Sequence, residues 1–188
     1  MAALIALLGG YLAYRAAMIK NEREHQAAER KIRRRKLALF LVASEVFVRL
    51  ETEAQEIDRK FSFPPEPGQT ARFEKRDFKI HAPDELTEIW SNLDIFPIIA
   101  IREIFSVRRS LPILLSAIDT LDDGKVYEID AENYSAVPWG IIQSNAQTVW
   151  ESSAVIFAAL AGPIEEMAPV AEHSIRMAAI FGTPDTEE

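Results

Sequence analysis

The chain has 188 residues, of which 48% are hydrophobic and 27% are charged, and its formal net charge is −8. These values are close to the averages of globular proteins, and the length fits one domain with an appendage. The chain contains no cysteine. Disulfides, thiolate metal sites and cysteine catalysis are therefore excluded.

The charge is divided unevenly along the chain. Residues 1–36 contain nine basic and three acidic residues, a net charge of +6. Residues 37–188 contain 12 basic and 26 acidic residues, a net charge of −14. This asymmetry indicates that the basic segment alone contacts a membrane or a polyanion.

Residues 2–19 are predicted to form a transmembrane helix. The segment is uncharged apart from Arg15, and as a helix it would span about 27 Å, near the roughly 30 Å of a bilayer's hydrocarbon core. Tyr11 and Tyr14 stand where interfacial aromatic residues are expected. A cleaved signal peptide is disfavoured because no basic residue precedes the apolar stretch. A soluble helix buried in an oligomer or against a partner is the alternative.

The flanks of this segment predict its orientation. All nearby basic residues follow it and none precedes it. Because basic flanks stay cytoplasmic, the prediction is a single-pass protein of the cell inner membrane. Its N-terminus would lie outside and its C-terminal domain in the cytoplasm.

Residues 20–36 are predicted to form a basic juxtamembrane helix. Six of the seven residues from 30 to 36 are basic, and each contributes about 1 kcal/mol of attraction to anionic lipid. Nucleic acid is disfavoured because the remaining chain is acidic and no aromatic residue interleaves the run. A solvated helix face is the other alternative. The residues predicted to contact lipid headgroups are Arg15, Lys20, Arg30, Lys31, Arg33, Arg34, Arg35 and Lys36.

The predicted fold class is all-α, with residues 37–182 forming an antiparallel bundle of four or five helices and residues 183–188 a loose tail. From Leu37 onward apolar residues recur at spacings of three and four, and the apolar stripe is wide. A stripe of this width predicts a helix that contacts several neighbours. The predicted partner interface consists of Leu39, Val46 and Leu50 on one edge of the stripe, together with Trp139 at a later helix entrance.

Prolines and glycines divide the rest of the chain. Residues 62–72 read as a proline-rich loop, with a PxxP ligand as the minor alternative. Residues 126–137 are predicted to be a loop because an isolated strand would lack a partner. Further helices are predicted over 83–93, 95–121, 138–162 and 163–181.

Residues Asp119–Asp130 partly match a calcium loop. Acidic residues and Gly124 fall on positions 1, 5, 6 and 12 of the EF-hand pattern, but Leu121 occupies position 3, where an oxygen ligand is required. The preferred interpretation is an acidic turn that ends a helix. No metal or cofactor is predicted.

The remaining candidates for chemistry are weak. The histidines, at 25, 81 and 173, stand far apart and lack metal-ligand spacing. The acidic residues around His173, at 165, 166 and 172, are interpreted as a solvated face. The sequence contains no nucleophile elbow and no phosphate-binding loop.

The sequence therefore predicts a non-enzymatic, membrane-anchored helical interaction module, an accessory or scaffold subunit of a larger membrane-associated complex. Its expected partners are anionic membrane lipid and either another protein or a second copy of the chain. The alternative is a membrane-tethered helical sensor that binds a small ligand or a metal.

Overall fold

The computed structural model describes residues 2–62, 66, 68–128 and 138–181. The chain divides into two units. We refer to residues 39–166 as the body, and to residues 1–38 together with residues 167–188 as the terminal unit. The long first and last helices contribute to both.

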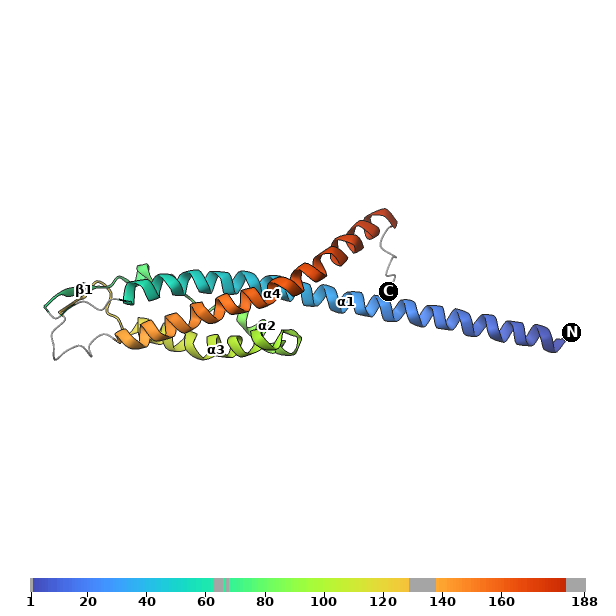
Figure 1. Ribbon diagram of the computed structural model, residues 1–188, viewed down its shortest axis with the longest axis horizontal. Helices are drawn as coiled ribbons and strands as arrows, with labels where there is room; N and C mark the ends of the chain where they lie inside the picture. The colour runs from blue at the N-terminus through green and yellow to red at the C-terminus, as the bar shows by residue number, and fades with distance from the viewer. Residues whose placement is uncertain (1, 63–65, 67, 129–137, 182–188) are drawn as a thin grey trace. The chain divides into compact units, whose positions relative to one another are not determined.

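The described residues are mostly helical, and Figure 1 shows the order of the elements. Four α-helices, two short 3-10 helices and one pair of strands make up the described chain. They are α1 (Ala2–Phe61), β1 (Thr70–Arg72), η1 (Lys75–Asp77), α2 (Leu86–Ser91), η2 (Leu93–Ile95), α3 (Ile98–Asp119), β2 (Val126–Glu128) and α4 (Trp139–Phe181).

No helix in the described part of the chain is long and apolar enough to cross a membrane. The predictions of a transmembrane helix over residues 2–19, of a single-pass inner-membrane protein and of its orientation are therefore wrong. α1 includes this segment but continues through Arg15 and the basic run as far as Phe61. The thirteen uncharged residues before Arg15 span only about 20 Å of helix, two-thirds of the hydrocarbon thickness.

α1 is a long helix because its sequence favours helix almost throughout. Alanine, leucine, arginine, lysine and glutamate dominate it, and no proline occurs before residue 64. Lys20 and Glu24 form an ion pair, and His25 Nδ1 lies 3.6 Å from Glu29 Oε1. Both pairs are four residues apart, a spacing that supports a helix. Arg59 and Lys60 in the last turn complement the negative end of the helix dipole.

The body is built from α3, the part of α4 up to Glu166 and the part of α1 from Leu39 onward, which lie lengthwise beside one another (Figure 1). Phe40 of α1 contacts Phe96 before α3, with ring centroids 5.1 Å apart. At the other end Phe61 contacts Trp139 of α4, at 4.8 Å. α1 therefore runs parallel to α3 and antiparallel to α4. The largest buried side chains on these helices are Phe40, Phe47, Leu50, Ile57, Phe61, Ile104, Leu111, Leu114 and Ile142.

α4 is one helix where the sequence predicts two. Gly162, Pro163 and Pro169 lie inside it. A proline inside a helix removes one hydrogen bond and favours a kink, but this cost does not by itself end a long helix. The predicted boundary at 162–163 is wrong for that reason.

A small antiparallel sheet corrects two further predictions. Thr70 pairs with Glu128, Ala71 with Tyr127 and Arg72 with Val126. The sequence predicts a loop over residues 62–72 from their prolines, and a loop over residues 126–137 because a strand there would be isolated. The two segments instead pair with each other across the chain. Where the two segments meet, the Gly124 amide donates to the Phe73 carbonyl, at 2.9 Å. Gly124 has a φ of +70°, a conformation that glycine adopts without strain.

An aromatic cluster joins this sheet to the helices. The ring of Phe73 lies 5.3 Å from Phe61, 5.6 Å from Trp139 and 5.9 Å from Tyr127. Trp139 Nε1 also donates a hydrogen bond to the Phe61 carbonyl, at 2.7 Å. The indole thus satisfies its donor while its ring covers apolar surface. The cluster fixes the end of α1 against the start of α4.

Phe47 and Val48 of α1 form a matched pair for testing the core. Phe47 is fully buried, whereas Val48 is 39% exposed. We expect Phe47→Ala to lower the free energy of unfolding by about 3–5 kcal/mol, because it leaves a cavity. Val48→Ala should change it by less than about 0.5 kcal/mol. Urea denaturation followed by circular dichroism measures both, and equal losses would contradict this assignment of the core.

Candidate functional site

Exposed apolar side chains recur along the outside of α3 and of α4 at multiples of seven residues. Ile99 and Ile113 on α3 are 62% and 43% exposed, and Ile141 and Val155 on α4 are 51% and 42% exposed. A half-buried hydroxyl residue stands midway in each row, Ser106 on α3 and Thr148 on α4. Seven-residue spacing keeps side chains on one helix face. Each helix therefore presents an apolar–hydroxyl–apolar row.

The two rows lie side by side because the register of α3 against α4 is fixed. Ser152 Oγ donates to Glu103 Oε2 at 2.9 Å, and farther along Ile113 and Ile141 line the same groove. These two observations show that α3 and α4 run antiparallel, since higher residue numbers on α3 lie beside lower residue numbers on α4. Each step along α3 is thus matched by an opposite step along α4. We call the resulting surface the α3–α4 seam, formed by the pairs Ile99–Val155, Ser106–Thr148 and Ile113–Ile141.

Charged side chains of opposite sign border the seam. Arg102 and Arg109 are exposed on the α3 side, and Glu151 is exposed on the α4 side. Arg102 Nε donates to Glu103 Oε1 at 3.0 Å, and Gln147 Nε2 donates to Glu151 Oε1 at 2.8 Å. Arg102 and Glu151 are thus each held near the seam by a neighbour on the same helix.

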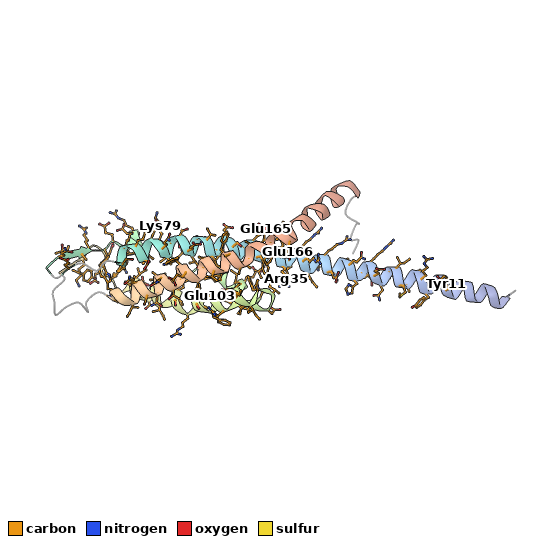
Figure 2. All side chains as sticks on the ribbon, in the orientation of Figure 1. Tyr11, Arg35, Lys79, Glu103, Glu165 and Glu166 are labelled. Atoms are coloured by element: carbon orange, nitrogen blue, oxygen red, sulfur yellow. The ribbon has the colours of Figure 1, made fainter. Side chains whose placement is uncertain are left out.

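Glu103, labelled in Figure 2, connects the core to this border. Its side chain is 14% exposed, while its partner Arg102 is 86% exposed. The carboxylate accepts bonds from both Arg102 and Ser152. Charge-assisted hydrogen bonds offset the cost of burying such a group. Glu103 therefore sets both the helix register and the position of Arg102.

At its Ile113 end the seam opens into an apolar groove of about 450 Å³. The other lining residues include Pro112 and Ala117 of α3 and Pro138 before α4. Ser116 and Thr120 are the polar side chains of the lining. The groove therefore extends the apolar surface of the seam and offers few groups for orienting a polar ligand.

The residues predicted as a partner interface do not lie on the α3–α4 seam. Leu39, Val46 and Leu50 are only 5%, 2% and 0% exposed, so the core of the body covers them. Trp139 is half-buried in the aromatic cluster. Within the body, the large apolar residues that α1 leaves exposed are Leu41, Val42 and Val48.

A signal for the seam is present in the sequence. Ile99 stands next to the periodic core residues of α3, and isoleucine recurs fourteen residues later as Ile113. Periodicity alone assigns the apolar residues of this helix to the core, because a single sequence does not show which faces of a helix are covered. The neighbour that brings the second row beside the first, α4, lies far along the chain.

The predicted lipid-contact residues lie along α1 in the terminal unit. Arg15, Lys20 and the run from Arg30 to Arg35 are exposed, and Lys36 is half-buried. Ile32 within the run is 66% exposed. Lys20 pairs with Glu24 at 3.9 Å, whereas residues 30–36 contain no acidic residue. The structure therefore presents this run, which we call the collar, as a basic helical surface.

The acidic turn after α3 is bound by two lysines. The Lys75 amide donates to Asp123 Oδ1, and Lys125 Nζ donates to Asp122 Oδ2, both at 2.8 Å. The hydrogen bond and the charge of Lys125 lower the pKa of Asp122. Among the described residues no group of three or more acidic or histidine side chains could hold a metal ion. Asp130, the last residue of the predicted calcium loop, lies outside the described residues.

His25 and His81 each have a partner on their own segment of the chain. His25 pairs with Glu29 at 3.6 Å, and His81 Nδ1 lies 3.2 Å from the Lys79 carbonyl. Glu165 and Glu166 are exposed and are labelled in Figure 2. The side chains of Glu172 and His173 lie outside those that the structure describes.

Comparison of the chain with protein-family models, with curated proteins and with solved structures finds no match. Its function is therefore inferred from the seam, the collar and the residues around them.

One carboxyl group of the body is placed unfavourably for its charge. Glu53 Oε2 and Arg49 Nε are both buried, and neither atom has a hydrogen-bond partner within the part of the chain that the structure describes. Burial raises the pKa of Glu53 above its usual range, and the opposing effects of His81, Arg49 and Lys79 are smaller. The ionised carboxylate therefore destabilises the fold.

Replacing Glu53 should change the pH dependence of stability. Because its pKa is raised in the folded state, the neutral acid stabilises the fold below about pH 4.3, the unfolded value. This contribution is lost as the pH rises through the folded pKa. Glu53→Gln should therefore have a higher Tm than the parent at pH 7, with the difference shrinking toward pH 4. Glu45→Gln, at an exposed position on the same helix, is the control for a general charge effect.

Proposed function

We propose that this chain is a non-enzymatic helical interaction module whose contact surface is the α3–α4 seam. The observation that carries the proposal is the alignment of two exposed apolar rows on adjacent antiparallel helices. The membrane-anchored form of this function is not retained, because no described helix can span a bilayer.

Exposed apolar side chains are common when they stand singly, but a contiguous patch indicates a contact surface. The seam carries an apolar patch at each end, Ile99 with Val155 at one end and Ile113 with Ile141 and the exposed Pro112 at the other. Rows spaced by seven residues suit the packing of further helices at a shallow angle. The bordering arginines and Glu151 would orient an incoming helix.

A small-ligand sensor is supported less well by the same surface. Ligand sites combine an apolar lining with a few polar groups that fix orientation. Among the described side chains that line the groove at the Ile113 end, Ser116 and Thr120 supply hydroxyl groups and the rest are apolar. The bordering charges Arg102 and Glu151 would remain without a role in that function.

The collar supports a second contact, with an anionic lipid surface that is bound without being crossed. Its basic residues lie on one stretch of helix that contains no acidic residue from 30 to 36. Each adds about 1 kcal/mol of attraction near an anionic bilayer. Nucleic acid is not proposed as a partner, because the remaining chain carries a net charge of −14 and would repel it.

The seam is tested by comparing two double variants of the tagged full chain. Ile113→Glu with Ile141→Glu places charge in the seam, and Leu41→Glu with Val48→Glu places it on the exposed face of α1. Affinity purification followed by quantitative mass spectrometry should show that the seam variant loses its associated proteins at least tenfold. The α1 variant should retain them.

Equal helical circular dichroism in both variants verifies that the fold is intact. The replaced side chains are between 39% and 51% exposed in all four positions, so neither variant should unfold the body. Retention of the same partners by the folded seam variant would show that the contact surface lies elsewhere.

The collar is tested with vesicles that contain one-third phosphatidylserine. Replacing Arg30, Arg33 and Arg34 with Gln should weaken binding of the full chain about 100-fold in a cosedimentation titration, because three charges of about 1 kcal/mol each are lost. Replacing Arg59, Arg76 and Arg109 with Gln is the control. These arginines are exposed outside the collar, and the control loses the same number of positive charges. Binding of the parent should fall steeply with salt, and equal binding by both variants would contradict the collar's role.

A further inference from the structure

We infer that the α3–α4 seam binds a second copy of this chain, related by a two-fold axis that runs along the seam. In this arrangement the partner's α3 lies over α4, and the partner's α4 lies over α3. The four helices form one antiparallel bundle. The inference rests on the proposed function, since it identifies the occupant of the same surface.

The bordering charges make the seam complementary to itself. Arg102 and Glu151 immediately precede Glu103 and Ser152, the two residues joined by the bond between α3 and α4. They therefore lie at nearly the same level along the helices, on opposite borders. A two-fold axis along the seam exchanges the borders without changing the level. Each Arg102 then meets Glu151 of the other copy, and the two ion pairs form at once.

The alternative two-fold axis in the same surface runs across the helices. It would place α3 over the α3 of the second copy and α4 over its α4. The border with Arg102 and Arg109 would then face the same border of the second copy. Like charges placed together in this way cost free energy and suppress the arrangement. The distribution of charge thus selects one of the two symmetric arrangements.

The apolar rows also fit the axis along the seam. This axis keeps each residue at its level, so each pair across the seam faces the same pair of the second copy. Ile99 and Val155 of both copies form one four-residue apolar layer. Ile113 and Ile141 form a second, and the hydroxyl groups of Ser106 and Thr148 lie between them. Layers that repeat every seven residues are typical of helices packed at about 20°. These hydroxyl groups donate to the Arg102 and Ser144 carbonyls of their own helices, so the layer can be buried without leaving a donor unpaired.

The dimensions of the seam indicate a weak association. From the first layer to the last it covers fourteen residues, or about 21 Å of helix. Two helices are about 20 Å wide, so each copy buries roughly 400 Å². The total lies below the roughly 1,200 Å² of a standard stable interface. We therefore expect a concentration-dependent dimer, dissociating in the micromolar range or above.

Sedimentation equilibrium of the purified full chain, extended to several hundred micromolar, tests the dimer directly. The parent should dimerise, and the dissociation constant should rise at least tenfold in Arg102→Glu and in Glu151→Arg, because like charges then face each other. An equimolar mixture of these two variants should form a heterodimer that is tighter than either variant's homodimer. In that mixed pair both contacts again join a glutamate to an arginine, so the heterodimer should be about as tight as the parental dimer.

The double variant Arg102→Glu with Glu151→Arg swaps the charges of both borders at once. Its two copies again meet with opposite charges in both ion pairs, so its dissociation constant should return toward the parental value. Arg102→Glu also removes a bond to Glu103, and Glu151→Arg does not replace that bond within the same copy. Recovery of the dimer therefore separates the proposed pairing from simple damage to the fold.

Failure of the double variant to dimerise better than the two single variants would overturn the two-fold axis along the seam. A parent chain that stays monomeric at every concentration would overturn self-association itself. A dimer that is unaffected by Ile113→Glu with Ile141→Glu would show that copies meet elsewhere, and would also overturn this inference. Leu41→Glu with Val48→Glu should leave the dimer unchanged.

These results are distinguishable from failure of the proposed function. A monomeric parent whose seam variant still loses an associated protein keeps the seam as a contact surface, but for a different partner. A parent that neither dimerises nor loses an associated protein in its seam variant overturns both.

Discussion

The burial of one broad apolar arc on α1 is the constraint on which the rest of the body depends. Phe40, Phe47, Leu50 and Phe61 are fully buried on this arc. An arc that broad is too wide for one neighbouring helix, so α3 and α4 must both lie on it. Two helices held on one arc are also held beside each other. The register between them is then completed by Ser152 and Glu103, and the seam is a consequence of that register.

The same constraint explains which predictions are wrong. Periodicity in the sequence predicts that residues after Leu37 form a helix with a wide apolar stripe, and the structure agrees. It does not show which edge of the stripe is covered, so it assigns Leu39, Val46 and Leu50 to a partner although the body buries them. Trp139 lies at a helix entrance as predicted, but its indole bonds to Phe61, 78 residues earlier in the chain.

The pairing of β1 with β2 is also not predictable from the sequence, because the two strands lie far apart in the chain. β1 and β2 are three residues each, and the pair from Arg72 to Val126 joins segments more than fifty residues apart. No local pattern identifies such a partner. The transmembrane prediction is wrong on a different point, since it joins the uncharged stretch before Arg15 to the apolar residues after it. The helical class of the body is predictable because spacings of three and four are local.

The position of charge on the body decides how far an assembly through the seam can grow. An apolar surface that meets a different surface of the next copy produces open chains, whereas a surface that meets itself closes after two copies. Arg102 on one border and Glu151 on the other favour the self-meeting arrangement. A slide of seven residues would place Arg102 opposite Ser144 or Ala158, and neither side chain carries a charge to replace that of Glu151. In the proposed dimer, forming both ion pairs also covers the apolar side chains of both seams. The assembly therefore closes at two copies.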